Sequence, residues 1–140
     1  MGPPGGGRQP VTNRMLRHMH CLSFVDMSSD EIKGIFNTIV EAFLANTLSE
    51  ALAPLAKPIV NATVDIYNAA LASLLPTPSK SHYTFNLRDL SKVFQGVLNA
   101  TPKNMGTKDV FLRLWVHESS RVFQDRLIDN TDRGIFMDLI

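Results

Sequence analysis

The apolar residues of this chain recur at helical spacing, and no other feature constrains its fold as much. In four segments the large apolar side chains fall three or four positions apart, which lines one face of an α-helix. The spacing predicts amphipathic helices over about residues 28–46, 58–75, 87–98 and 107–129. Their apolar faces consist of Ile32, Ile35, Phe36, Ile39, Val40, Phe43 and Leu44; Ile59, Ala62, Ile66, Ala69, Ala70 and Leu74; Leu90, Val93, Phe94, Val97 and Leu98; and Val110, Phe111, Leu114, Trp115, Val122, Phe123 and Leu127. The short turns between the later helices favour a compact bundle.

Residues at the expected helix ends support these boundaries. Ser28 and Glu31 match a capping box, in which two side chains satisfy free N–H groups of a first turn. Pro58 suits the first turn of the second helix, and Asn86 can cap the third. The segment 48–57 stays ambiguous. After a break at residues 130–134, a further helix is expected to begin at Ile135.

The N-terminal part follows a different pattern. Residues 1–10 are rich in Gly and Pro and predict a loop, and residues 12–18 predict a short helix. His20–Val25 alternates in part, which predicts a short strand. Because an isolated strand is not stable, this one needs a sheet that the rest of the chain does not supply. We therefore expect the chain to be a piece of a longer protein.

The composition limits the classes of protein to which the chain can belong. Of 140 residues, 44% are hydrophobic and 19% charged, which is typical of a globular domain with a core. The net charge of +1, with scattered basic residues, predicts no nucleic-acid partner. The lone Cys21 excludes an internal disulfide and fits a reducing compartment. No apolar run approaches the roughly 20 residues that span a bilayer, and Met1 precedes Gly and Pro rather than a secretory signal.

The Gly-rich opening resembles a phosphate loop only in its spacing. Gly2 and Gly7 are separated as in such a loop, but Arg8 and Gln9 occupy the places of the Lys and Ser/Thr. The Lys contacts phosphate and the hydroxyl binds Mg²⁺, so their loss removes the mechanism. The pattern argues against an independent P-loop ATPase.

No metal site is predicted from the His and Cys residues. His18, His20, Cys21 and His117 do not provide four ligands at a familiar spacing. Alternation along the expected strand also sends His20 and Cys21 to opposite faces.

Arg88 is the residue most suited to bind an anion. It lies in the first turn of the third helix, directly after its cap Asn86 and Leu87. A helix N-terminus carries partial positive charge and free N–H groups, and Arg adds a formal charge where phosphate is the usual ligand. The alternative is an exposed arginine on the shoulder of a helix.

Arg14 and Arg17 form a second candidate site. They are three residues apart, hence on the same side of the short helix that precedes the expected strand. Arginines presented on one face can reach a phosphate across a subunit boundary. The alternative is a solvated basic face.

Four segments together resemble the third AAA+ module of dynein heavy chains, and the axonemal members more than the cytoplasmic ones. The segments are MGPPGGGR at 1–8, VTNRMLRH at 11–18, LLPTPSKSHYTFNLRDLSKVFQGVL at 74–98 and LWVHESSRVFQDRL at 114–127. They are spread over the whole chain in the family's order. The FNLRDLSKVFQG version, residues 85–96, is most similar to inner-arm heavy chains.

This resemblance implies a mainly α fold. The chain would hold the AAA+ small helical lid, a four-helix bundle, preceded by the last strand of the large α/β subdomain. Residues 1–27 would be the end of the large subdomain, 28–129 the lid, and 130–140 the start of the connection to the next module. The Walker A and Walker B elements would precede Met1, so this chain alone is not expected to hydrolyse ATP.

The resemblance also assigns roles to the candidate residues. Arg88 matches the sensor-II arginine, which reports on the module's own nucleotide. Arg14 and Arg17 match the arginine-finger region, which faces the nucleotide of the preceding module. Gly2 falls at the sensor-I position, where the cytoplasmic relatives carry Asn; because Gly has no side chain, direct sensing of a γ-phosphate there is in question.

The implied function is that of a fragment of an ATP-driven, minus-end-directed microtubule motor of cilia and flagella. The full module would bind ATP or ADP with Mg²⁺, which this chain alone is not expected to hold tightly. Expected partners are the rest of the heavy-chain ring and, through the parent protein, dynein intermediate and light chains and microtubules. The expected location is the axoneme of the cilium or flagellum, in the cytoskeleton. The alternative is a stand-alone helical protein-interaction module without catalytic activity.

Overall fold

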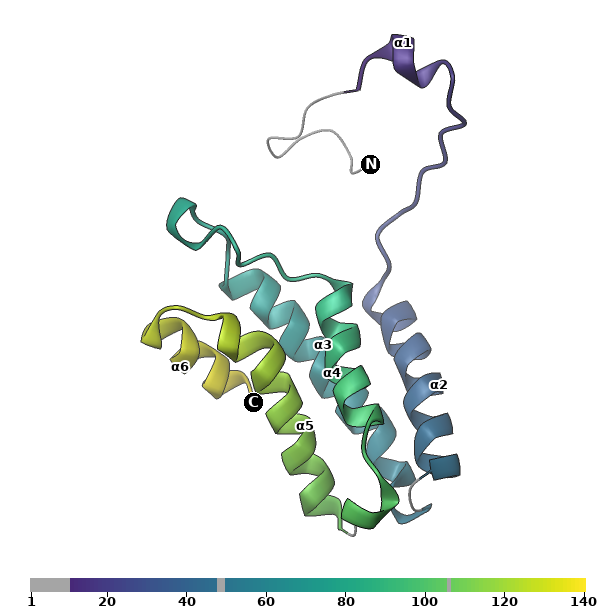
Figure 1. The fold of residues 1–140 in the computed structure, drawn as a ribbon, viewed down its shortest axis with the longest axis vertical. Helices are drawn as coiled ribbons and strands as arrows, with labels where there is room; N and C mark the ends of the chain where they lie inside the picture. Colours follow the sequence, from purple (N-terminus) through teal and green to yellow (C-terminus); the bar gives the residue numbers. More distant parts are fainter. Residues whose placement is uncertain (1–10, 48–49, 106) are drawn as a thin grey trace.

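Six α-helices account for most of the structure, a computed structural model that describes residues 11–47, 50–105 and 107–140 (Figure 1). Short 3-10 helices connect several of them, and the described residues contain no strand. The α-helices are α1 (Asn13–Leu16), α2 (Ser29–Thr47), α3 (Ala56–Ser73), α4 (Leu87–Leu98), α5 (Lys108–Phe123) and α6 (Asn130–Leu139).

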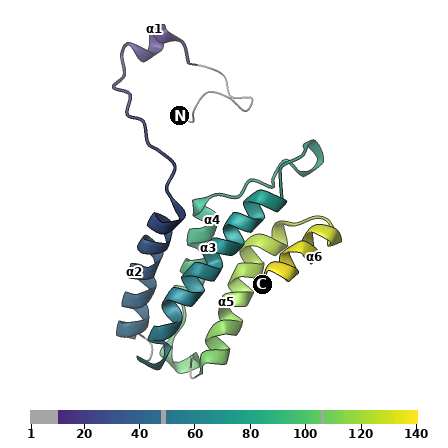
Figure 2. The ribbon, with the colours of Figure 1, turned by 180° about the vertical axis from the view of Figure 1, so that it is seen from behind.

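The predicted four-helix bundle is confirmed. Helices α2, α3, α4 and α5 run alternately up and down, with α2 against α3 and α4 against α5 (Figures 1 and 2). Helix α6 packs against α3 and lies beside α5 in both views (Figures 1 and 2). The start of α4 and the ends of α3 and α5 consequently lie at one end of the bundle (Figure 1). We call it the sensor end, after the predicted sensor-II residue Arg88 in the first turn of α4.

Apolar side chains from helices α2 to α6 form one core. Phe36 of α2 stacks on Phe94 of α4, with ring centroids 4.5 Å apart. Burying a side chain of this size contributes about 1.5–3 kcal/mol. The apolar face of α2 is wider than its buried part, because Ile35 and Ile39 remain exposed. Fully buried core residues include Val40, Leu44, Val60, Val64, Leu90, Val93, Phe94, Phe111, Phe123 and Phe136.

The predicted caps are present at α2 and α4. The Ser28 N–H donates to Oε2 of Glu31 at 2.7 Å, and the Glu31 N–H donates to Oγ of Ser28 at 3.3 Å. At α4 the Arg88 N–H donates to Oδ1 of Asn86 at 2.9 Å. The Asn86 N–H in turn donates to Oδ2 of Asp89 at 3.2 Å, so α4 begins with a complete capping box.

Three boundaries differ from the sequence-based expectation. Helix α5 ends at Phe123 rather than near residue 129, and a 3-10 helix over Gln124–Arg126 follows it. A 3-10 helix over Glu50–Leu55 fills most of the ambiguous segment, and α3 begins at Ala56 with Pro58 in its first turn. The last helix begins at Asn130 rather than at Ile135. Phe136 of this helix is fully buried, and its ring centroid lies 6.1 Å from that of Phe123. This tertiary contact stabilises the first turn of α6, which the local sequence alone does not favour.

The strand predicted at His20–Val25 does not form in this chain by itself. These residues have no regular secondary structure, and Leu22, Phe24 and Val25 are 81%, 90% and 92% exposed. A strand needs a neighbouring strand to pair its backbone groups, and the described part of the chain offers none. Helix α1 is shorter than expected and lies apart from the bundle in both views (Figures 1 and 2).

Candidate functional site

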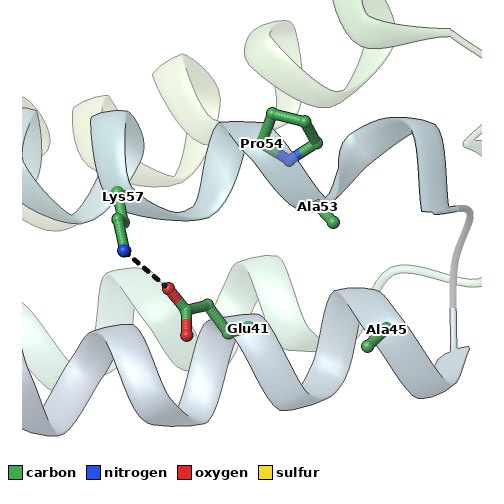
Figure 3. A pocket seen from close by; sticks show the side chains of 5 residues that line it. All are labelled: Glu41, Ala45, Ala53, Pro54 and Lys57. Atoms are coloured by element: carbon green, nitrogen blue, oxygen red, sulfur yellow. Dashed lines mark ion pairs between the residues drawn. The ribbon is translucent and has the colours of Figure 1, made fainter.

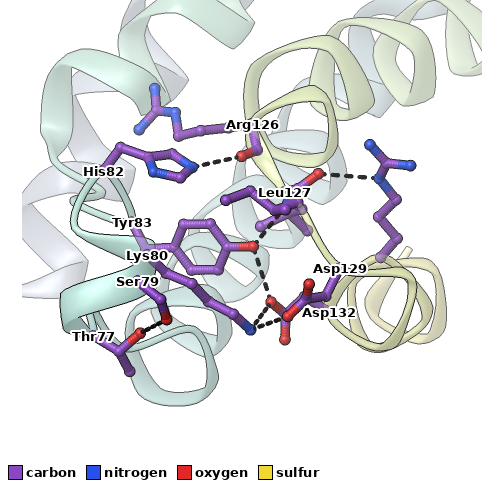
Figure 4. A network of polar contacts seen from close by, with 11 residues as sticks. Thr77, Ser79, Lys80, His82, Tyr83, Arg126, Leu127, Asp129 and Asp132 are labelled. Carbon is purple, nitrogen blue, oxygen red and sulfur yellow. Dashed lines mark hydrogen bonds and ion pairs between the residues drawn. The ribbon is translucent and has the colours of Figure 1, made fainter.

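Polar side chains gather at the sensor end, where the loop before α4 meets the junction between α5 and α6 (Figure 4). The loop spans residues 77–86 and the junction residues 124–133. Nζ of Lys80 lies 2.6 Å from a carboxylate oxygen of both Asp129 and Asp132. The Tyr83 hydroxyl donates to Oδ2 of Asp132 at 2.9 Å and accepts the Ile128 N–H at 2.9 Å. Two segments more than forty residues apart in sequence are thereby joined.

Lys80 and Asp132 each stabilise the charged form of the other. The hydrogen bonds that the Lys80 ammonium donates to Asp129 and Asp132 raise its pKa. The hydrogen bond from Lys80, followed by that from Tyr83, lowers the pKa of the Asp132 carboxyl. Lys80 therefore stays charged at physiological pH, and the loop is held to the junction by an ionic contact and by Tyr83, whose ring is buried.

Asp89 and Arg126 form the second connection. Nη2 of Arg126 donates to Oδ1 of Asp89 at 2.7 Å, and Nη1 donates to Oδ2 at 3.2 Å. The side chain of Asp89 is 4% exposed and that of Arg126 25%. Burial by itself raises the pKa of the Asp89 carboxyl, but the hydrogen bonds and charge of Arg126, with smaller contributions from Asn86 and Lys92, hold that pKa below its ordinary value.

Arg88 sits between these contacts with its side chain in solvent. Its own N–H is held by the cap, and its neighbour Asp89 is buried, while the Arg88 side chain is exposed. Within the described ranges, its guanidinium takes part in no hydrogen bond or ion pair. A guanidinium in the first turn of a well-ordered helix lies where an anion would be stabilised by the charge and by the helix dipole.

Arg14 and Arg17 are not brought near this site. Both are exposed, Arg14 within α1 and Arg17 at its C-terminal end, where Nε of Arg17 contacts Nε2 of His18 at 2.9 Å. Helix α1 lies beyond the bundle in both views. The sensor-I position, Gly2, is outside the described residues.

Hollows elsewhere on the bundle lack comparable chemistry. One lies between α2 and the start of α3 and is lined by Glu41, Ala45, Ala53, Pro54 and Lys57 (Figure 3). Its Lys57–Glu41 ion pair is long, 4.0 Å, and exposed. A second is lined by Ala62, Asp65, Ile66, Ala69, Trp115, Leu139 and Ile140. The described residues contain no group of three or more His, Cys, Asp or Glu side chains placed to hold a metal, and none of their helices has the length and hydropathy to cross a membrane.

Comparison with known proteins accounts for this arrangement. The family model "Dynein heavy chain, ATPase lid domain" matches residues 35–133, a range that includes the whole sensor end from the loop to the α5–α6 junction. This chain belongs to the dynein heavy chain family. The predicted resemblance and the helical lid fold are confirmed.

The similarity to axonemal dynein heavy chains extends over the whole chain. It is 47% identical to dynein axonemal heavy chain 1 of Mus musculus and 48% identical to dynein axonemal heavy chain 1 of Homo sapiens, over 151 aligned residues in each case. It is 45% identical to dynein axonemal heavy chain 3 of Mus musculus over 140 residues. Each alignment covers all of this chain but only 3–4% of the relative, so the chain spans a small part of the length of these dyneins.

Sequence reasoning did not identify which residues pair to hold the sensor end together. Asp89 and Arg126 are 37 positions apart, and Lys80 and Asp132 are 52 apart, so no local spacing links them. One local clue was available: Asp89 follows Asn86 by three positions, the spacing of a capping box. It indicates that Asp89 caps α4, but it does not indicate that Asp89 pairs with Arg126.

Proposed function

We propose that this dynein chain forms the nucleotide-sensing lid of one AAA+ module, with Arg88 as the residue that contacts the phosphates of the module's own nucleotide. The observation that carries the proposal is the position of Arg88: exposed, in the first turn of α4, on a backbone fixed by a complete capping box. An arginine held in this way gains a charge-assisted contact when phosphate arrives, without the cost of ordering the helix end.

The lid would act as a rigid body. The helices share one core, so a contact at Arg88 moves α4 together with the helices packed on it. ATP and ADP differ in the phosphate available to Arg88, which gives the two nucleotides different affinities for two lid orientations. A nucleotide can change the orientation of the lid only if its affinity differs between the two orientations.

The parts outside the bundle fit the same proposal. We assign residues 28–129 to the lid, 1–27 to the end of the large subdomain, and 130–140 to the start of the connection onward. The exposed apolar side chains of Leu22, Phe24 and Val25 suit a strand that pairs with a sheet in that subdomain. Arg14 and Arg17, both exposed, would face the nucleotide of the preceding module. The third module is the one that the sequence resemblance indicates.

The whole protein would be an axonemal, minus-end-directed microtubule motor that uses ATP with Mg²⁺. The support is the similarity of the entire chain to dynein axonemal heavy chains 1 and 3. Its partners would be the remaining AAA+ modules, dynein intermediate and light chains and the microtubule, in the axoneme of the cilium or flagellum.

The test is Arg88→Ala in a full heavy chain that carries this segment. Loss of one charge-assisted contact is expected to weaken mant-ADP binding by about tenfold at one class of site. Arg113→Ala is the matched control, since Arg113 is an exposed arginine on α5. Unchanged nucleotide affinity together with unchanged microtubule gliding velocity in Arg88→Ala would refute the proposal.

A further inference from the structure

We propose that Arg126 is a positioning residue that acts through Arg88. Its guanidinium binds Thr84 before Arg88 and Asp89 after it, a set of contacts that we call the clamp, and this fixes the direction in which α4 presents Arg88. This inference rests on the proposed function of Arg88 and adds a residue to it. Arg126 lies in a 3-10 helix at the end of α5, 38 positions after Arg88.

The geometry of the clamp is specific to a guanidinium. Nη1 of Arg126 donates to the Thr84 carbonyl oxygen at 3.1 Å and to Oδ2 of Asp89 at 3.2 Å, while Nη2 donates to Oδ1 of Asp89 at 2.7 Å. Thr84 precedes the cap of α4, and Asp89 follows Arg88 directly. One planar side chain therefore joins the incoming loop to the first helical turn. A lysine, with a single nitrogen, cannot reproduce this fork.

The clamp is itself held in place. The guanidinium of Arg126 lies over the buried ring of Phe85, 5.3 Å from its centroid. Nε2 of His82 is 3.1 Å from the Arg126 carbonyl oxygen (Figure 4). Oδ2 of Asp89, which accepts from Arg126, also accepts the Asn86 N–H of the capping box. The cap that orients the backbone of Arg88 thus shares an acceptor with the clamp.

Removal of Arg126 has a local consequence that does not require unfolding. Asp89 would be left as a buried carboxylate whose one remaining cationic neighbour, among the residues that the structure describes, is Lys92 at 3.7 Å. A buried charge without its partner draws in water or turns outward. Either response frees Asp89 from the Asn86 N–H and loosens the turn that carries Arg88. The expected result is weaker nucleotide binding in a lid whose core remains folded.

A double-mutant cycle in the full heavy chain tests this inference. Arg126→Gln is expected to weaken mant-ADP binding by about fivefold to tenfold when Arg88 is present, and by less than about twofold in the Arg88→Ala background. Arg121→Gln is the matched control, because it breaks the Arg121–Glu118 ion pair of 2.8 Å within α5 and leaves α4 capped. That control is expected to bind mant-ADP like the unmodified protein.

Arg126→Lys is the second variant, for use where Arg126→Gln does not fold. It keeps a charge beside Asp89 but not the contact with Thr84, so we expect an intermediate loss of affinity, about threefold. An equal loss from Arg126→Gln with and without Arg88 would overturn the inference, as would no loss at all. Both outcomes leave the proposed function standing if Arg88→Ala still weakens binding, whereas no effect of Arg88→Ala refutes the proposed function itself.

Discussion

Arg88 and the pair Arg14 and Arg17 are all exposed arginines on helices, but the helices that carry them are held very differently. The turn with Arg88 is fixed by a capping box, by the buried Asp89 and by Arg126 from a distant segment. Helix α1 has no buried residue and no side-chain cap, and the described segment after it exposes most of its apolar side chains. The bundle therefore positions one candidate site by itself and leaves the other to contacts outside it.

This difference indicates where each arginine would receive its orientation. A side chain placed by its own domain can report on a ligand through movement of that domain. A side chain on an unsupported helix takes its direction from whatever packs around that helix. We therefore expect changes inside the bundle to affect Arg88 strongly, and changes in residues 11–27 to leave the bundle unaffected.

The largest expected effect on the bundle comes from Phe123→Ala. Phe123 is fully buried between Phe85, before α4, and Phe136 of α6, with ring centroids 5.8 Å and 6.1 Å away. The cavity should lower the free energy of unfolding by about 3–5 kcal/mol, measured by urea unfolding of the chain followed by circular dichroism. A loss below about 1 kcal/mol would show that the sensor end does not depend on the common core.

A smaller loss is expected from Asp89→Asn, and it should depend on pH. The pKa of Asp89 is lowered in the folded chain, so its contribution to stability is present above the unfolded pKa of about 3.9 and is lost as the pH falls through the lower folded value. At neutral pH the variant should be less stable by about 2–3 kcal/mol, since Arg126 loses its charged partner. Urea unfolding of both proteins at neutral pH and at about pH 3 should show that the difference between their free energies of unfolding shrinks in acid. The same difference at both pH values would mean that the effect comes from packing rather than from charge.

The smallest effect is expected in the N-terminal segment. Replacing Leu22, Phe24 and Val25 together by Ser removes exposed side chains that make no core contact, so the free energy of unfolding should change by less than about 0.5 kcal/mol. The same variant should raise the solubility limit of the isolated chain, because it removes an apolar patch. A clear loss of stability in the same urea titration would mean that this segment packs on the bundle, contrary to the comparison.

The sequence by itself determined the helices and their caps. Apolar spacing defines the buried faces of α3 and α4, and Ser28, Asn86 and Pro58 mark helix starts, because these depend on neighbours within one or two turns. It also determined that Arg88 lies in a first turn, and the family to which the chain belongs. The strand expected at His20–Val25 does not form within this chain, because alternation states a local preference, whereas a strand requires a partner.

Only the tertiary structure decided how the sensor end is held together. It placed Arg126 on Asp89, Lys80 on Asp129 and Asp132, and started α6 five residues before the expected position. Such pairs join segments far apart in the chain, and their partners are chosen by the packing of helices rather than by spacing along the sequence. Burial explains the strength of one of these pairs: Asp89 needs Arg126 because the folded bundle removes its carboxylate from water.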